Sequence, residues 1–236
     1  MKSDRIVRRK LSDEVFDRLK RIITGGDLLP GDEMPSEREL MDRFGVGRPA
    51  IREAMQSLAN MGLISISHGE RARVLEVTAQ SIIRQVDQTA HIMLSRSTDS
   101  LEHLKNARLF FERGMVREAA LKASSDDMLA LRAILAEQRE SLGDAERFIA
   151  ADMRFHVRIA AISGNPIFVA VSEAMLGWLK AYHTEMLLWA GKERHTLAEH
   201  DEILGCIEVR NADGAEAALV RHLERSRSLY TLNRPG

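Results

Sequence analysis

The segment ADMRFHVRIAAI, residues 150–161, places a carboxylate and an imidazole in an otherwise mostly apolar stretch. Asp152 and His156 are four residues apart, so on a helix their side chains project from one face. Ile149 and Ile159 fall on the same face, which we therefore expect to be buried. Burying a carboxylate is costly unless it has a partner, so the pair indicates a metal site, a reactive site or a hydrogen-bonded core.

Two further histidines lie on inward-facing apolar stripes later in the chain. His200 and His222 each follow a leucine placed three residues earlier. If both converge with Asp152 and His156, three imidazole nitrogens and one carboxylate oxygen make an ordinary ligand set for a divalent metal. From spacing alone, a hydrogen-bonded core histidine is the more common explanation of each position, so both alternatives stay open.

Composition limits the classes of function. The 236-residue chain has a formal net charge of −1, which argues against wholesale binding to nucleic acid or acidic membranes. Cys206 is the only cysteine, which excludes an internal disulfide and a multi-cysteine zinc site. No apolar run approaches the roughly 18 residues of a membrane span. We expect a cytoplasmic protein with no membrane partner.

The chain divides into two compositional regimes, which predict a mainly α fold. Residues 1–77 carry three of the five prolines and the only convincing strands, with 14 basic and 13 acidic side chains. Residues 78–236 show helical periodicity, interrupted by turn sequences such as SGNP and NADG. We expect an N-terminal DNA-binding domain with a basic arm, and an all-helical bundle of about six to seven helices that binds an effector.

The N-terminal regime predicts a helix-turn-helix followed by a β wing. A first helix is expected over 12–24, and a second begins after Ser36, whose spacing to Glu39 is that of a capping box. A third helix has Pro49 in its first turn and ends near residue 60, before Gly62. Two strands, residues 63–67 and 71–77, flank the turn sequence HGE.

Arginines on the third helix are candidates for reading DNA. Arg48 and Arg52 are four residues apart and face away from the apolar stripe that includes Ile51. Arginine suits this task because its planar fork matches the paired acceptors of guanine, or a phosphate. Arg38, near the start of the second helix, can add a third contact. The alternative is that all three are solvated surface side chains.

The sequence MPSERELMDRFGVGRPAIREAMQSLANMGLI resembles the DNA-binding signature of the GntR superfamily, over roughly residues 10–75. The resemblance implies that Arg38, Arg48 and Arg52 read DNA and that His68 and Gly69 of the wing approach the minor groove. The wing sequence HGERARV departs from the common G-x-G-x-F-V form and resembles that of members controlling sialic-acid catabolism. Arg71 and Arg73 are therefore possible further contacts, with solvated wing charges as the alternative.

The C-terminal half resembles the FCD-type ligand-binding domain of the FadR subfamily, in its metal-binding branch. The sequences DMRFH, AEHDEI and LVRHLE supply Asp152, His156, His200 and His222 in the order of that branch. The resemblance implies that these four are metal ligands. Zinc, Zn²⁺, is the first expectation, while Ni²⁺ or Mn²⁺ also suits a mixed nitrogen and oxygen set.

The same resemblance implies a pocket for a small carboxylate effector, such as sialic acid, a sugar acid or another organic acid. Arg108 lies on the apolar stripe of Leu101 and Leu104 and is followed four residues later by Glu112. Either both contact the effector or they pair with each other. Asn165, in SGNP, either contacts the effector or only forms a turn.

These features predict a transcriptional regulator, a repressor rather than an activator, and not an enzyme. The motifs H-E-x-x-H and G-x-S-x-G and a phosphate loop are absent from the sequence. One short recognition helix reads few bases, so we expect a homodimer on a pseudo-palindrome of double-stranded operator DNA. A regulator whose metal is purely structural is the alternative.

Overall fold

The structure is a computed structural model that describes residues 9–67, 69–81, 83, 90, 92–94, 98–183 and 193–229. The chain forms two compact units, residues 1–85 and 86–236. This division lies later than the expected boundary after residue 77, which stays a prediction. Among the described residues, no helix is both long enough and apolar enough to cross a membrane.

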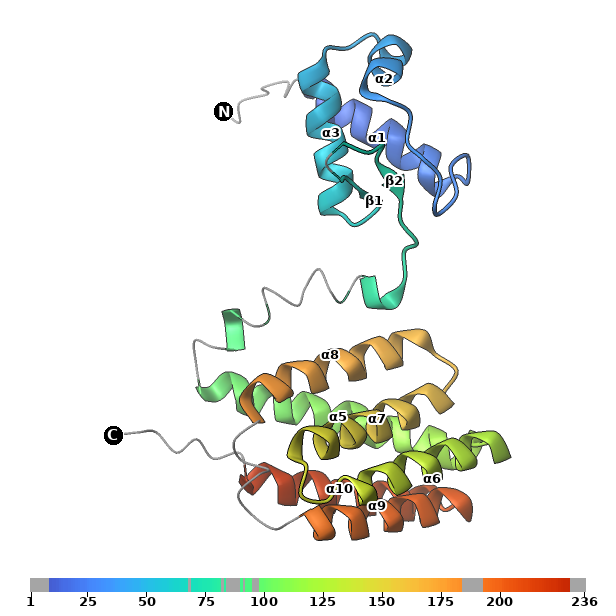
Figure 1. Cartoon of the computed structure of the whole chain (residues 1–236), viewed down its shortest axis with the longest axis vertical. Helices are drawn as coiled ribbons and strands as arrows, with labels where there is room; N and C mark the ends of the chain where they lie inside the picture. Colours follow the sequence, from blue (N-terminus) through green and yellow to red (C-terminus); the bar gives the residue numbers. More distant parts are fainter. Residues whose placement is uncertain are drawn as a thin grey trace, which may run out of the picture. The chain divides into compact units, whose positions relative to one another are not determined.

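Between residues 9 and 74 the N-terminal unit contains three helices and a short antiparallel sheet (Figure 1). In chain order they are α1 (Leu11–Thr24), α2 (Glu37–Phe44), α3 (Arg48–Asn60), β1 (Ile64–Ser65) and β2 (Arg73–Val74). Side chains at 0–1% exposure from every helix and from β1 form its core: Leu19, Leu40, Ile51, Leu58 and Ile64. The expected mainly α fold with a helix-turn-helix and a wing is confirmed.

Local chemistry fixes both ends of α2 and the start of α3. Ser36 and Glu39 form the expected capping box, in which each side chain bonds the other's backbone N–H. Gly45 ends α2 in the left-handed conformation, φ 65°, which glycine adopts without strain. Pro49 occupies the first turn of α3, where its missing N–H costs nothing. Together these residues set the angle at which α3 leaves the turn.

The strands of the wing are shorter than the sequence predicts. Only two residues of each strand pair, with Ile64 opposite Val74. Beyond that pair the alternating apolar residues Leu75 and Val77 are exposed, so they have no core to pack against. The alternation over residues 71–77 therefore overstates the strand. An isolated bridge between Glu33 and the second strand extends the sheet on its other side.

The described part of the C-terminal unit contains six long helices. They are α5 (Thr98–Lys122), α6 (Ser125–Glu140), α7 (Ala145–Ile162), α8 (Pro166–His183), α9 (Glu193–Glu208) and α10 (Ala212–Leu229). In Figure 1 these helices lie roughly side by side, with α8 along one edge and α9 and α10 along the other. The helix α5 contacts α7, α8, α9 and α10, so it is the central helix of the bundle.

The largest apolar cluster of this unit joins α5, α6, α7, α9 and α10. Leu131, Leu135, Phe155 and Ile203 are among its members, each at 0–1% exposure. Phe155 also stacks on the ring of His200, with 4.4 Å between the ring centroids. Polar side chains from α7, α9 and α10 thus enter a closely packed apolar interior, where they need partners.

Candidate metal centre and nucleic-acid interface

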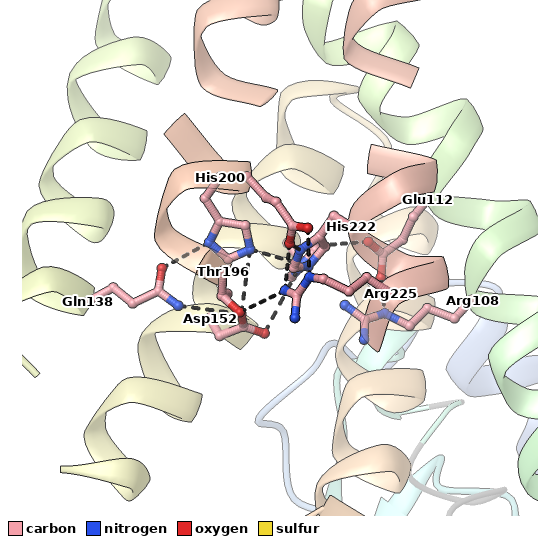
Figure 2. A network of polar contacts seen from close by, with 10 residues as sticks. Arg108, Glu112, Gln138, Asp152, Thr196, His200, His222 and Arg225 are labelled. Atoms are coloured by element: carbon pink, nitrogen blue, oxygen red, sulfur yellow. Dashed lines mark hydrogen bonds and ion pairs between the residues drawn. The ribbon is translucent and has the colours of Figure 1, made fainter. Parts of the chain in front are cut away.

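Asp152, His156, His200 and His222 converge in the interior of the helical bundle. Asp152 and His156 come from α7, His200 from α9 and His222 from α10. Each offers a ligand atom, and these four atoms lie within 4.8 Å of one another. Figure 2 shows His200, His222 and Asp152 facing a common point. The structure therefore brings together all four residues that the sequence singled out.

The spacing of the four side chains matches the dimensions of a zinc site. The Nε2 atoms of His200 and His222 are 3.4 Å apart, and His200 Nε2 lies 3.5 Å from Asp152 Oδ1. His156 Nε2 lies 3.9 Å from Asp152 Oδ2. Zn–N bonds of about 2.0–2.1 Å in a tetrahedron place ligand atoms about 3.3 Å apart. The separations of 3.4 and 3.5 Å are close to this value, whereas the wider ones, up to 4.8 Å, would have to shorten for all four atoms to bind one ion.

The outer nitrogen of each imidazole is held by a residue that is not one of the four ligands. His200 Nδ1 and Gln138 Oε1 form a hydrogen bond of 2.9 Å, and His222 Nδ1 and Glu199 Oε2 one of 2.8 Å. His156 Nδ1 contacts Glu112 Oε2 at 2.6 Å. Such outer partners fix the ring orientation and the tautomer, so that Nε2 faces the metal.

Burial supplies an independent test of whether a cation fits here. The side chains of His156 and His200 are 0% exposed and that of His222 is 4% exposed, whereas Asp152 is 20% exposed. Both ring nitrogens of His156 are buried, and neither makes a hydrogen bond of good geometry among the described residues, although Nδ1 lies 2.6 Å from Glu112 Oε2. An orphaned buried nitrogen is costly, and a metal ion would satisfy it. The donor set and the orphaned Nε2 of His156 both fit a divalent metal.

Burial favours the neutral, metal-binding form of two of the imidazoles, His200 and His222. Burial lowers the pKa of His200 well below its ordinary value, and the nearby His222 and His156 lower that pKa further. Burial also lowers the pKa of His222, against the raising effect of its bond to Glu199. Metal binding requires neutral imidazole, so a lowered pKa removes proton competition at neutral pH.

The carboxylates behind the histidines are strongly ionised. Burial acts to raise the pKa of Glu112, but Arg108 and His156 outweigh it and bring that pKa to about 2. In Glu199, burial is likewise outweighed by His222 and Arg225, and its pKa is also about 2. Both glutamates are therefore anionic at neutral pH and can hold the Nδ1–H of the imidazole that each contacts.

Sequence reasoning missed three of these outer residues: Gln138, Glu199 and Arg225. Arg225 binds Glu199 through two nitrogens, at 2.6 Å each, and also bonds Thr196 at 3.0 Å (Figure 2). Gln138 could have been found, because it continues the buried stripe of Leu131 and Leu135 on α6. Glu199 and Arg225 gave no such signal.

The two expected effector residues on α5 are engaged with each other. Arg108 Nε bonds Glu112 Oε1 at 2.5 Å, and both side chains are at most 7% exposed. Because Glu112 also contacts His156, it belongs to the support of the metal cluster. Mutual pairing of Arg108 and Glu112 is therefore what this structure contains, and contact of either residue with an effector stays a prediction.

Asn165 has a local role at the start of α8. Its Oδ1 accepts a hydrogen bond of 3.0 Å from the backbone N–H of Ile167. Asparagine is favoured at such positions because its side chain satisfies an otherwise unpaired N–H. The structure thus agrees with the turn that the sequence offered as the alternative to effector contact.

The arginines of the helix-turn-helix lie on its surface. Arg38, Arg48 and Arg52 are all exposed. Glu37 contacts two of them, with its Oε1 at 2.8 Å from Arg52 Nε and its Oε2 at 3.5 Å from Arg48 Nε. The hydrogen bond to Glu37 raises the pKa of Arg52, which in any case remains charged.

The wing residues fall into different environments. Gly69 is exposed with φ 81°, a conformation that favours glycine. Arg71 is exposed and lines a groove together with Arg52. Arg73 bonds Glu33 at 2.6 Å and the carbonyl of Gly31 at 3.1 Å, so its guanidinium ties the wing to the preceding loop. His68 lies outside the described residues.

A winged helix-turn-helix followed by a separate helical bundle is the architecture of a DNA-binding regulator with a second, all-helical domain. Residues 11–74 match the family described as "Bacterial regulatory proteins, gntR family", and residues 103–225 match the FCD domain. The chain belongs to the GntR family of transcriptional regulators and carries an FCD domain.

Curated relatives extend over most of the chain. The "HTH-type transcriptional repressor NanR" of Cronobacter sakazakii is 40% identical over 220 residues, 92% of this chain and 84% of that protein. The NanR repressor of Klebsiella aerogenes is 39% identical over 224 residues, 93% of this chain and 85% of that protein. The expectation of a transcriptional regulator rather than an enzyme is confirmed by these relatives.

Solved structures share the fold at low sequence identity. "Streptococcus agalactiae GntR" superposes with a TM-score of 0.69 at 22% identity, covering 92% of this chain and 99% of that one. "E. coli McbR/YncC" gives a TM-score of 0.53 at 19% identity, with coverages of 94% and 98%. These similarities support the architecture alone.

Proposed function

We propose that the protein is a homodimeric repressor that binds a pseudo-palindromic operator and responds to a small carboxylate effector at a metal-containing site. The observation that carries this proposal is the convergence of Asp152, His156, His200 and His222 in the helical bundle. Three buried imidazoles that converge on one carboxylate are more than a packed core requires.

Zinc is the metal that we propose. Three nitrogen ligands and one oxygen suit Zn²⁺, although Ni²⁺ and Mn²⁺ also accept a mixed set. Asp152 is the most exposed of the four ligands, which gives an effector an approach from its side. A bound divalent ion would supply a positive charge that attracts a carboxylate oxygen.

Arg108 supports the choice of an anionic effector. Its guanidinium is buried next to the cluster and already balances Glu112. Sialic acid is our first choice of effector, because curated relatives are named NanR repressors and the wing sequence resembles that of regulators of sialic-acid catabolism. Sugar acids and other organic acids are the next candidates for the effector. Linkage requires that an effector favouring the released state weaken DNA binding as much as DNA weakens effector binding.

An exposed apolar surface on the C-terminal unit supports the proposed dimer. Phe110 is 77% exposed on α5, and Ile167 is 60% exposed on α8, a helix that contacts α5. Phe110, Phe111 and Phe168 line one groove of about 540 Å³. Large apolar patches of this kind mark protein interfaces. A second copy of the chain would cover these apolar side chains and supply a second DNA-binding domain.

The experiment uses the full chain and an operator selected from a random double-stranded DNA library. Metal content is measured, and operator affinity is then compared with and without chelator and with N-acetylneuraminate, uronic acids, lactate and dicarboxylates. The proposal expects about one divalent ion per chain and an acid that weakens operator binding only while the metal is present. An effector response that survives complete metal removal would contradict it.

A purely structural metal is a second candidate, favoured by the near-complete burial of the three histidines. Structural zinc sites are closed by four protein ligands, and four are available here. In that case chelation lowers the melting temperature, whereas no carboxylate alters either melting or operator affinity.

A further inference from the structure

Glu37 stands between the two arginines that are proposed to read DNA. It is the first residue of α2, and each of its carboxylate oxygens faces a different arginine of α3. The Oε1 atom accepts a hydrogen bond of 2.8 Å from Arg52 Nε, and Oε2 lies 3.5 Å from Arg48 Nε. One negative charge on the proposed DNA-binding face thus lies between two cations.

Stability of the fold does not explain this arrangement. Arg48 and Arg52 are 61% and 69% exposed and Glu37 is 36% exposed, and ion pairs at such exposure contribute little to stability. The start of α2 is already satisfied by the capping box of Ser36 and Glu39. What the carboxylate does determine is where two long and otherwise freely rotating side chains point.

The hydrogen bond between Arg52 and Glu37 leaves the terminal nitrogens of the Arg52 guanidinium available for DNA. Glu37 takes the Nε–H, on the side of the guanidinium, and the terminal nitrogens take no part in that bond. Those terminal nitrogens form the fork that matches the paired acceptors of guanine. Arg52 and Glu37 also line one groove of about 520 Å³ together with Arg71 of the wing.

We propose that Glu37 is a positioning residue that sets the sequence specificity of DNA binding. It holds Arg52, and more loosely Arg48, with the terminal nitrogens directed outward before DNA arrives. Its charge also opposes binding of these arginines to the phosphates of unrelated DNA. The inference rests on the proposed reading of the operator by Arg48 and Arg52.

The test compares Glu37→Gln with the wild-type full chain on the selected operator and on a scrambled duplex of equal length. We expect operator affinity to fall about tenfold, because a rotamer-rich side chain must then be ordered during binding. Affinity for the scrambled duplex should rise, and the slope of log affinity against log salt should steepen by about one phosphate contact. The ratio of the two affinities is the decisive readout.

Glu53→Gln is the matched control. Glu53 is an exposed glutamate of α3, next to Arg52 in sequence, and it contacts Lys10 at 3.5 Å. The control removes the same charge from a neighbouring position of the helix-turn-helix without touching Arg48 or Arg52, so it should leave the specificity ratio near that of the wild type. An equal fall in the ratio for both variants would reduce the effect to net charge and overturn the proposal.

Arg52→Ala separates this inference from the proposed function. If Arg52→Ala leaves operator binding unchanged, the proposed reading is wrong. If it weakens binding but Glu37→Gln keeps the wild-type ratio and salt slope, only the role of Glu37 is refuted. In the Arg52→Ala background, Glu37→Gln should lose most of its effect. If Glu37→Gln lowers the affinities for operator and scrambled duplex equally and also lowers the melting temperature, Glu37 has a structural role and the proposal is overturned.

Discussion

Replacing Gln138 by leucine tests whether residues outside the ligand set shape the metal centre. Gln138 is 0% exposed on α6, and its Oε1 binds His200 Nδ1 at 2.9 Å. Its Nε2 also donates to Asp152 Oδ1 at 3.4 Å. Leucine has a similar size but removes both contacts, so His200 loses the bond that turns its Nε2 inward while the packing volume is largely kept.

Two magnitudes follow from these contacts. Loss of an outer partner typically weakens metal binding by roughly 10–100-fold, which corresponds to about 1.4–2.8 kcal/mol. Without metal, the buried and unpaired Nδ1–H of His200 should cost about 1–3 kcal/mol of folding free energy. In a domain of this size, each kcal/mol lowers the melting temperature by about 2–4 °C.

The assay is a competition between the full chain and a chromophoric zinc chelator, followed by thermal unfolding with the metal removed. Glu137→Leu is the control, because Glu137 is the preceding residue, is 45% exposed and pairs with Arg154 on the surface. The control should keep the zinc affinity of the wild type. A Gln138→Leu protein with wild-type zinc affinity would refute the claim that this amide orients His200.

Three other outcomes are expected. The double change His156→Ala with His222→Ala should abolish stoichiometric metal binding, measured by elemental analysis after gel filtration; full retention of metal would remove the site. Phe110→Asp should shift the protein towards monomer in analytical ultracentrifugation with unchanged helical content, since this ring is 77% exposed within one chain; an unaltered dimer would place the interface elsewhere. Asp127 has a pKa lowered by its hydrogen bonds with Ser124, so its stabilising effect is present above the unfolded pKa of about 4 and is lost as pH falls further. Asp127→Asn should therefore lower the free energy of unfolding at neutral pH and flatten its acid dependence; parallel pH curves for the two proteins would contradict this.

The burial of the candidate metal ligands and the local helix signals were predictable from sequence for a common reason. Asp152 and His156 share a helix face, and His200 and His222 interrupt apolar stripes, so period and burial alone place them in the interior. The capping box of Ser36 and Glu39 likewise depends on residues three apart. In each case the deciding interaction is local, or follows from which face of a helix is buried.

The features that the sequence did not predict depend on contacts between elements that are far apart in the chain. Glu199 and Arg225 belong to α9 and α10, and nothing in either helix alone shows that they meet behind His222. The pairing of Glu37 with Arg52 depends in the same way on how α2 and α3 cross. The wing strands were overestimated because alternation is present in residues 71–77 whether or not a second layer exists to bury it.

The three imidazoles come from three different helices, and this has a consequence for how the chain acquires its structure. His200 and His222 are 22 residues apart, and Gln138 is 62 residues from the imidazole that it orients. Closing such loops has an entropic cost that is repaid only when the helices dock, so the ligand set exists only after α7, α9 and α10 are assembled. A metal ion that binds only the assembled form adds its binding free energy to folding. Zinc supply during synthesis would then set how much of the regulator survives proteolysis, apart from any effector.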